Sequence, residues 1–270
     1  MPTDVVLKPF WKTLESSDQA ALLLDYDGTL APFRIARDQA IPYPGVREKL
    51  AAIRRETRTR LVVISGRAVD DLLPLLGLNP PPEIWGCHGW EQLDADGHRP
   101  AVSLPEPAHQ GLSAARQWVE KEALQDFCEV KPASLAIHWR GLPENQKTAL
   151  QGRVEAGWEL IARQYGLAIH PFNGGLELRC PGRDKGTAIR TILDQAVPGQ
   201  PVAFLGDDLT DEDGFAVIKG QGLAVLVSRQ KRKTAADLRL VPPEELLDFL
   251  AQWLTHAPKG QRRAVRRAGN

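Results

Sequence analysis

Three short apolar runs, each followed closely by polar residues, limit the folds open to this chain. The runs are residues 21–24, 61–64 and 202–205, and none of them alternates between apolar and polar positions. An unbroken run of this length is typical of a parallel strand that is covered on both faces. Helical patterns lie between the runs, and a further strand is expected at 84–89. We therefore predict right-handed βαβ units and an α/β fold with a Rossmann-like parallel sheet.

The residues that follow these runs favour phosphoryl transfer. Asp25 and Asp27 follow the first run, Ser65 follows the second, and Asp207 comes just after the third. Open α/β sheets bind ligands beyond the carboxyl ends of their strands. Asp25 and Asp27 point to the same side of an extended chain, so one can attack phosphorus while the other works as acid and base. Taken alone, Asp-Tyr-Asp-Gly could equally be a turn after a strand.

Two further segments supply what this reaction needs. Lys185 opens the helical pattern of residues 187–193, where its charge can balance an aspartate and a phosphate. Asp207, Asp208 and Asp211 form an acidic cluster that suits a magnesium ion, because Mg²⁺ prefers oxygen ligands. A solvated lysine and an acidic helix start are the ordinary alternatives. The order of all four segments along the chain favours an active site.

That order resembles the four motifs of the haloacid dehalogenase (HAD) superfamily. The resemblance implies that Asp25 is the nucleophile and Asp27 the general acid and base. It also implies that Ser65 binds the phosphoryl group and that Lys185 neutralises charge. A magnesium site is implied as well, and its residues would be Asp25, Asp27 through its carbonyl group, Asp207, Asp208 and Asp211, the last two as ligands or as support.

Longer segments are similar to the trehalose-6-phosphate phosphatase family, whose members carry a C2-type cap. These segments are Gly-Asp-Asp-Leu-Thr-Asp-Glu-Asp-Gly-Phe from residue 206, Leu-Glu-Leu-Arg from 176, and Glu-Val-Lys from 129 with Ser-Leu-Ala-Ile-His-Trp-Arg from 134. The element His-Gly-Trp-Glu from residue 88 is also similar, but Trp90 replaces a small residue, and Trp139 stands where tyrosine is common. The resemblance implies magnesium-dependent hydrolysis of trehalose-6-phosphate through an aspartyl phosphate.

Other functions stay open at this point. The two tryptophans lie in segments that meet the sugar, so the substrate could be another glycosyl phosphate, such as glucosylglycerol or glucosylglycerate phosphate. A sugar phosphomutase would keep Asp25 and Asp27, and a noncatalytic sugar-phosphate sensor would need neither.

The pattern changes from residue 104, which indicates an inserted module. A helix is expected at 114–123, strands at 127–131 and 134–140, a long helix at 144–165, and strands at 167–172 and 176–179 joined by Asn173-Gly174-Gly175. This module resembles the cap of sugar-phosphate phosphatases. We therefore predict a HAD-like core at 1–103 and 181–258, a smaller α+β cap domain at 104–180, and a disordered basic tail at 259–270.

Sugar selectivity is expected in the cap. The resemblance implies substrate contacts by Glu129, Lys131 and Glu177, while spacing alone would fit a solvated ion pair of Glu129 with Lys131. Further candidates for substrate binding are Arg67, His88, Glu91 and Arg140. Structural roles or surface pairing are the alternatives for these, and Trp90 could stack on a sugar or plug a loop.

Composition indicates the setting in which the protein works. The net charge is +0, so no overall field attracts nucleic acid or anionic membranes. No apolar run approaches the roughly 18 residues of a membrane span, and the start lacks a signal-peptide pattern. Cys87, Cys128 and Cys180 are widely spaced and are expected to be buried thiols in a reducing compartment. We expect a soluble cytoplasmic monomer that acts on a small sugar phosphate.

Overall fold

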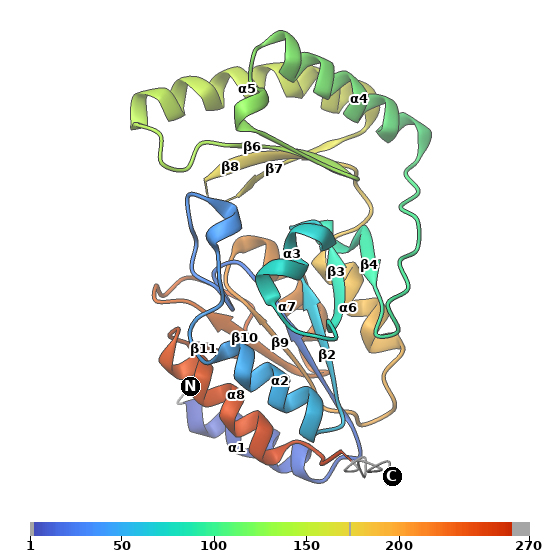
Figure 1. Cartoon of the computed structure of the whole chain (residues 1–270), viewed down its shortest axis with the longest axis vertical. Coiled ribbons are helices and arrows are strands. Elements are labelled where there is room, and N and C mark those ends of the chain that lie inside the picture. Colours follow the sequence, from blue (N-terminus) through green and yellow to red (C-terminus); the bar gives the residue numbers. More distant parts are fainter. Residues whose placement is uncertain (1–2, 173, 261–270) are drawn as a thin grey trace, which may run out of the picture.

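The computed structural model describes residues 3–172 and 174–260, which form a large α/β core with a smaller part stacked on one edge (Figure 1). The core sheet has the strand order β11-β10-β9-β1-β2-β3-β4. All neighbouring strands are parallel except β3 and β4. The bounds are β1 Ala20–Leu24, β2 Thr59–Ile64, β3 Glu83–Gly86, β4 Glu91–Leu93, β9 Val202–Gly206, β10 Leu223–Val227 and β11 Leu238–Leu240.

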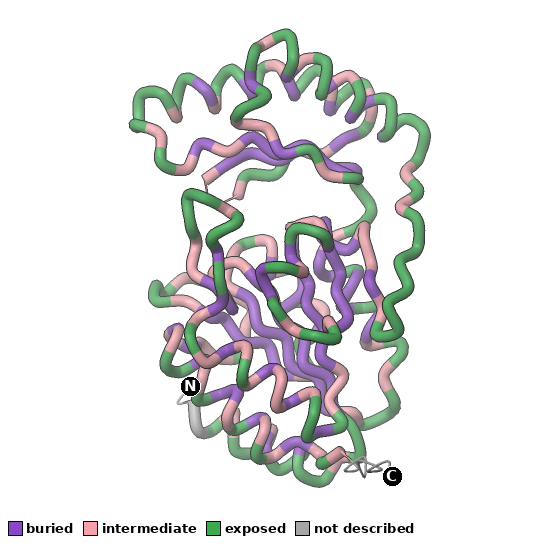
Figure 2. The backbone as a smooth tube through the Cα atoms, in the orientation of Figure 1, coloured by how far each residue is buried: buried purple, intermediate pink, exposed green. Residues whose placement is uncertain are grey.

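Helices cover both faces of this sheet, which explains its unbroken apolar strands. Leu22 and Leu24 of β1 belong to the core cluster under α1, α2, α3 and α8, while Ala21 and Leu23 belong to the cluster under α6 and α7. All of β1 is therefore buried. Figure 2 shows buried backbone, in purple, along the strands of the core sheet. The helices are α1 Thr3–Glu15, α2 Val46–Glu56, α3 Val69–Leu76, α6 Lys185–Asp194, α7 Glu212–Ile218 and α8 Glu244–His256.

The smaller part is an antiparallel sheet with the order β5-β6-β8-β7, covered on its outer side by two helices (Figure 1). Its elements are α4 Glu106–Lys121, β5 Cys128–Lys131, β6 Ser134–His138, α5 Glu144–Tyr165, β7 Ala168–Phe172 and β8 Gly175–Arg179. It has its own apolar core around Trp158 and Leu178. The turn between β7 and β8 includes Asn173, which lies outside the described residues. We refer to this part as the cap, and its proposed limits at 104 and 180 stay a prediction.

Several expected elements have different bounds. The strand expected to run to residue 89 ends at Gly86, because Cys87 and His88 adopt positive φ angles of 48° and 57° in a 3₁₀ turn. The helix expected from residue 114 begins at Glu106, since Pro107 in its first turn needs no hydrogen-bond donor there. The strand expected to reach residue 140 ends at His138. The sequence patterns did not predict α1 or β11.

Residues 259 and 260 pack against the core, although they were expected to belong to a disordered tail. Lys259 pairs with Thr57, and the Gly260 amide donates to the Glu56 carbonyl at 2.9 Å. The rest of the predicted basic tail, residues 261–270, lies outside the described residues.

Two further expectations concern membranes and thiols. Among the described residues, no helix combines the length and the apolar character needed to cross a membrane. Cys87, Cys128 and Cys180 are free thiols, as expected, but Cys128 is only partly buried.

Candidate active site

A buried lysine joins two aspartates at the carboxyl edge of the core sheet. Asp25 directly follows β1, and Lys185 is the first residue of α6. The Lys185 Nζ atom lies 2.6 Å from Asp25 Oδ1 and 2.7 Å from Asp211 Oδ1. Asp184 caps α6 by accepting the Thr187 amide at 2.6 Å, which fixes where Lys185 leaves the helix. Residues 160 positions apart are thus held as one ionic group.

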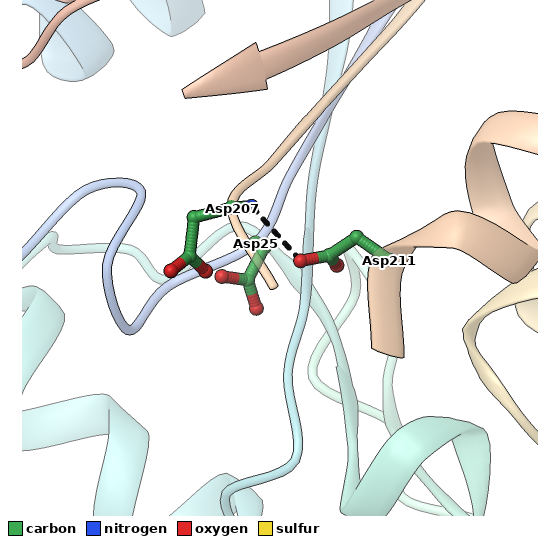
Figure 3. A group of neighbouring side chains, drawn as sticks. All are labelled: Asp25, Asp207 and Asp211. Atoms are coloured by element: carbon green, nitrogen blue, oxygen red, sulfur yellow. Dashed lines mark hydrogen bonds between the residues drawn. The ribbon is translucent and has the colours of Figure 1, made fainter. Parts of the chain in front are cut away.

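A third carboxylate, that of Asp207 after β9, completes an acidic cluster (Figure 3). Asp25, Asp207 and Asp211 each offer an oxygen within 4.8 Å of the others. Asp211 is fully buried, and its Oδ2 accepts the amides of Asp207 and Asp208, both at 2.9 Å. Because Lys185 holds its other oxygen, both oxygens of Asp211 already have partners. The Asp208 carboxylate accepts the Leu209 amide at 2.7 Å.

Gly28 allows the segment after β1 to approach the segment after β9 closely. Its φ is +86°, and a Cβ atom there would lie 2.0 Å from Asp207 Oδ2. A larger residue would therefore displace Asp207 and strain the turn after Asp25.

Burial in this cluster raises the pKa values of Asp25 and Asp207. Burial raises the pKa of Asp25 from 3.8 to about 7, because it outweighs the opposing charge of Lys185. Burial, together with Asp25 and Asp211, raises the pKa of Asp207 well above its usual range. Burial lowers the pKa of Lys185, but Asp211 and Asp25 outweigh it and raise this pKa. A bound cation would relieve this repulsion between carboxylates.

The raised pKa of Asp25 predicts a pH-dependent effect of Asp25→Asn on the metal-free protein. Native Asp25 keeps its proton to a higher pH than unfolded Asp25, so its contribution to stability is lost as pH rises from 3.8 to about 7. Asparagine does not titrate. In EDTA we therefore expect the variant to gain free energy of unfolding over the unaltered protein across this interval, by at most about 1.4 kcal/mol per pH unit. Urea unfolding at several pH values measures this, and a constant difference would contradict it.

Asp27 is paired with Arg67 on the neighbouring strand end. Arg67 Nε and Nη2 donate to the two Asp27 carboxylate oxygens at 2.6 and 2.7 Å. The Arg67 amide donates to Ser65 Oγ at 3.2 Å, and Ser65 is buried. Arg67 therefore contacts Asp27 through its guanidinium and Ser65 through its backbone amide.

A cavity of about 120 Å³ lies between this edge and the cap. Its lining residues are Asp25, Asp27, Phe33, Arg37, Ser65, Gly66, Arg67, His88, Glu129, Lys131, His138, Arg140, Phe172, Glu177, Lys185, Asp207, Asp208 and Thr210. Most predicted site residues are thus brought together. Asp211 and Glu91 are not in the lining. The Glu91 carboxylate accepts the Val69 amide at 2.9 Å and the Cys87 thiol at 3.3 Å, so it holds the turn after β3 instead of facing the cavity.

Glu177 links the cap to the core. Its Oε1 accepts from Lys131 Nζ at 2.9 Å and Ser134 Oγ at 2.7 Å, and its Oε2 lies 3.1 Å from His88 Nε2. Burial raises the pKa of Glu177, but Lys131 and His88 outweigh it and hold this pKa well below its ordinary value. Burial lowers the pKa of His88 to about 4, so its imidazole is neutral near pH 7. Glu177 therefore stays ionised beside a neutral histidine.

Glu129 and Lys131 are buried in the cavity wall and do not form a solvated strand face. Lys131 Nζ lies 3.6 Å from Glu129 Oε2, and both side chains are only 8% exposed. Glu129 Oε1 and His88 Nδ1 are buried and have no hydrogen-bond partner among the described residues. Each of these two atoms can therefore accept a further hydrogen bond.

Six lining residues are not among the site residues predicted from the sequence: Phe33, Arg37, Gly66, His138, Phe172 and Thr210. His138 lies within a segment that was singled out, but Phe33 and Arg37 lie in a loop with no motif or periodicity. Trp90 and Trp139, in contrast, are not in the lining. Trp139 is buried in the cap core, and Trp90 packs on that core with Arg183 Cζ 5.0 Å from its ring centre. The position of Trp90 matches the loop-plug alternative.

Comparisons with known sequences agree with this geometry. The family model described as Trehalose-phosphatase matches residues 23–243. The chain is 31% identical to the trehalose-6-phosphate phosphatase of Escherichia coli over 218 residues, which cover 80% of this chain and 79% of the relative. It is 30% identical to the probable trehalose-phosphate phosphatase 4 of Oryza sativa, covering 85% of this chain and 64% of the relative. It thus spans slightly less than two thirds of the latter.

Solved structures show the same fold. The C-terminal domain of Candida albicans trehalose-6-phosphate phosphatase gives a TM-score of 0.77 at 20% identity, covering 92% of this chain and 96% of that one. A haloacid dehalogenase-like hydrolase from Bacteroides thetaiotaomicron gives 0.62 at 21% identity, covering 87% and 99%. The parallel core with an inserted cap is therefore a HAD-like architecture, as predicted.

Proposed function

Because this chain belongs to the trehalose-phosphatase family, we propose that it hydrolyses trehalose-6-phosphate to trehalose and inorganic phosphate. The observation that carries the proposal is the buried Asp25–Lys185 pair in the wall of a cavity that charged cap residues close. A nucleophile and a cation face the cavity on the core side. Carboxylates and an ammonium group, which suit sugar hydroxyls, face it on the cap side.

Asp25 and Asp27 divide the reaction into two steps. A carboxylate oxygen of Asp25 attacks phosphorus, the bond from phosphorus to the sugar oxygen breaks, and Asp27 gives its proton to that oxygen. Asp27 then takes a proton from water, which attacks the aspartyl phosphate and regenerates Asp25 as phosphate leaves. General acid and base assistance of this kind contributes roughly 10²- to 10⁴-fold.

Ser65, Lys185 and Arg67 bind the transferred group in this proposal. Lys185 already contacts Asp25, so it can balance charge on the nucleophile and on the phosphoryl oxygens. Arg67 is paired with Asp27. A phosphoryl group offers the Arg67 guanidinium a second anionic partner. If the guanidinium leaves Asp27 and binds the phosphoryl group, Asp27 becomes free to carry a proton.

The cofactor we propose is Mg²⁺, held by Asp25, the Asp27 carbonyl and Asp207, with Asp208 nearby. The donor set fits, because all of these donors are oxygens and because Asp25 and Asp207 are crowded carboxylates with raised pKa values. When bound, the ion supplies positive charge against the phosphoryl oxygens. Asp211, whose oxygens are already engaged, is assigned to support Lys185 and the Asp207 backbone.

The sugar is proposed to contact His88, Glu129, Lys131 and Glu177. The unpartnered Glu129 Oε1 and His88 Nδ1 can each accept a hydrogen bond from a sugar hydroxyl. The cavity of about 120 Å³ is small for a disaccharide phosphate, since ligand sites commonly measure about 300 Å³ or more. We therefore propose that the cap moves away from the core to admit this substrate.

Phosphate release from a panel of sugar phosphates tests the proposal. We expect at least about tenfold preference for trehalose-6-phosphate over glucose-6-phosphate, sucrose-6-phosphate, and glucosylglycerol and glucosylglycerate phosphates, since a ligand that leaves buried polar groups unpaired binds weakly. EDTA should reduce the rate to background, and Mg²⁺ should restore it.

Each other result has a definite meaning. Activity confined to another sugar phosphate would replace the substrate but keep the chemistry. A requirement for a sugar bisphosphate would indicate a phosphomutase. No release from any ester would favour a sugar-phosphate sensor.

A further inference from the structure

A core loop of residues 32–39 reaches the cap beside the cavity; it is the blue segment rising between β1 and α2 in Figure 1. Both ends of the loop are tied to the nucleophile turn. The Ala31 amide donates to the Tyr26 carbonyl at 3.1 Å, and the Tyr26 hydroxyl donates to the Ala40 carbonyl at 2.7 Å. The base of the loop is therefore fixed relative to Asp25 and Asp27.

Arg37 of this loop makes an ion pair with Glu129 of the cap. Arg37 and His138 contact the same oxygen, Glu129 Oε2, and His138 Nε2 lies 2.9 Å from it. Arg37 Nη1 lies 3.4 Å from that imidazole nitrogen. Burial raises the pKa of Glu129, but His138, Lys131 and Arg37 outweigh it and lower this pKa to about 2. Glu129 is thus a fixed anion when the loop and cap are in contact.

The two oxygens of Glu129 have different surroundings. Oε2 is occupied by Arg37 and His138, while Oε1 is buried without a partner. A carboxylate that is gripped at one oxygen has little freedom to rotate, so the direction of the other oxygen is set. Glu129 and Arg37 both line the central cavity.

Arg37 also stands at a boundary between two cavities. Arg37, Glu129, His138 and Arg140 line both the central cavity and a neighbouring one of about 260 Å³ beside residues 126–128. The ion pair therefore lies in the walls of both cavities.

We propose that Arg37 is a positioning residue for sugar recognition: it grips Glu129 when the cap closes and aims the free oxygen at a sugar hydroxyl. The sugar site is then composite, built from a cap carboxylate and a core guanidinium. This inference rests on the proposed function, because it assumes a glycosyl phosphate substrate. It predicts that Arg37 matters for esters with a sugar hydroxyl at Glu129 and not for esters without a sugar.

The test compares Arg37→Gln and Arg37→Lys with Arg34→Gln. Arg34 is an exposed arginine of the same loop, and in the described residues its side chain makes no hydrogen bond or ion pair. KM and kcat are measured with trehalose-6-phosphate and with p-nitrophenyl phosphate, in Mg²⁺. For Arg37→Gln we expect KM for the sugar ester to rise about tenfold, the effect of losing one charge-assisted contact. Arg37→Lys should recover part of this, and p-nitrophenyl phosphate kinetics should stay within about twofold.

Equal changes in Arg37→Gln and Arg34→Gln would overturn the proposal, and so would a parallel loss with p-nitrophenyl phosphate. If the unaltered protein prefers another sugar phosphate, only the proposed substrate fails, and the same comparison is made with the preferred one. If the unaltered protein cleaves no sugar ester, amide hydrogen exchange without substrate tests the proposal instead. The proposal then requires faster exchange of residues 128–131 in Arg37→Gln but not in Arg34→Gln, and unchanged exchange would overturn it.

Discussion

Asp25→Asn should remove turnover while leaving the protein folded. Asparagine matches the shape of aspartate but cannot form the acyl phosphate, so we expect kcat to fall by at least about 10⁴-fold. Folding should survive, because Asp25 is one of three crowded carboxylates and Lys185 keeps Asp211 as a partner. The loss should therefore be chemical and not structural.

Single-turnover phosphate release and circular dichroism measure the two parts of this expectation. Asp38→Asn is a matched control, because Asp38 is an exposed carboxylate of the core loop, and it should keep near-normal activity. Robust turnover by Asp25→Asn would remove Asp25 from the role of nucleophile. Loss of folded structure would instead mean that the carboxylate is needed for packing.

Lys185→Met should cost both activity and stability. Lys185 is 3% exposed and is the ion-pair partner of Asp25 and Asp211. Removing one partner of a buried ionic group leaves uncompensated charge, which typically costs about 3–5 kcal/mol. Turnover should also fall, because the ammonium group that balances charge on the nucleophile and on the phosphoryl group is lost.

Urea unfolding in EDTA measures the stability change. Lys219→Met, at an exposed lysine, should change the free energy of unfolding by less than about 0.5 kcal/mol. The double variant Lys185→Met with Asp211→Asn should regain part of the lost stability without regaining activity, because it removes one orphaned carboxylate. A fully stable Lys185→Met protein would show that these carboxylates do not need the lysine.

The core of the fold could be predicted because its signals are local. The strands before Asp25, Ser65 and Asp207 are covered on both faces, so their sequences are apolar without a break. Parallel strands bring such carboxyl ends to one edge, which explains why distant motifs meet. Lys185 could be placed there too, because it begins a helix after Asp184.

The missed features depend on contacts between parts of the chain that share no pattern. Arg37 meets Glu129 only after the cap has folded onto the core, and its loop has no periodicity. Glu91 looked like a site residue because its segment fits a motif, yet its carboxylate turns toward the Val69 amide. The early end of β3 follows from positive φ angles at Cys87 and His88, which side-chain identity did not indicate.

The small size of the closed cavity has a kinetic consequence. At about 120 Å³, the cavity between core and cap is smaller than the roughly 300 Å³ or more that is common for ligand sites, so we expect the cap to open when trehalose is exchanged for its phosphate ester. Every catalytic cycle must then include one opening of the cap, and kcat cannot exceed the rate of that opening. If cleavage is faster than opening, solvent viscosity will slow steady-state turnover of trehalose-6-phosphate.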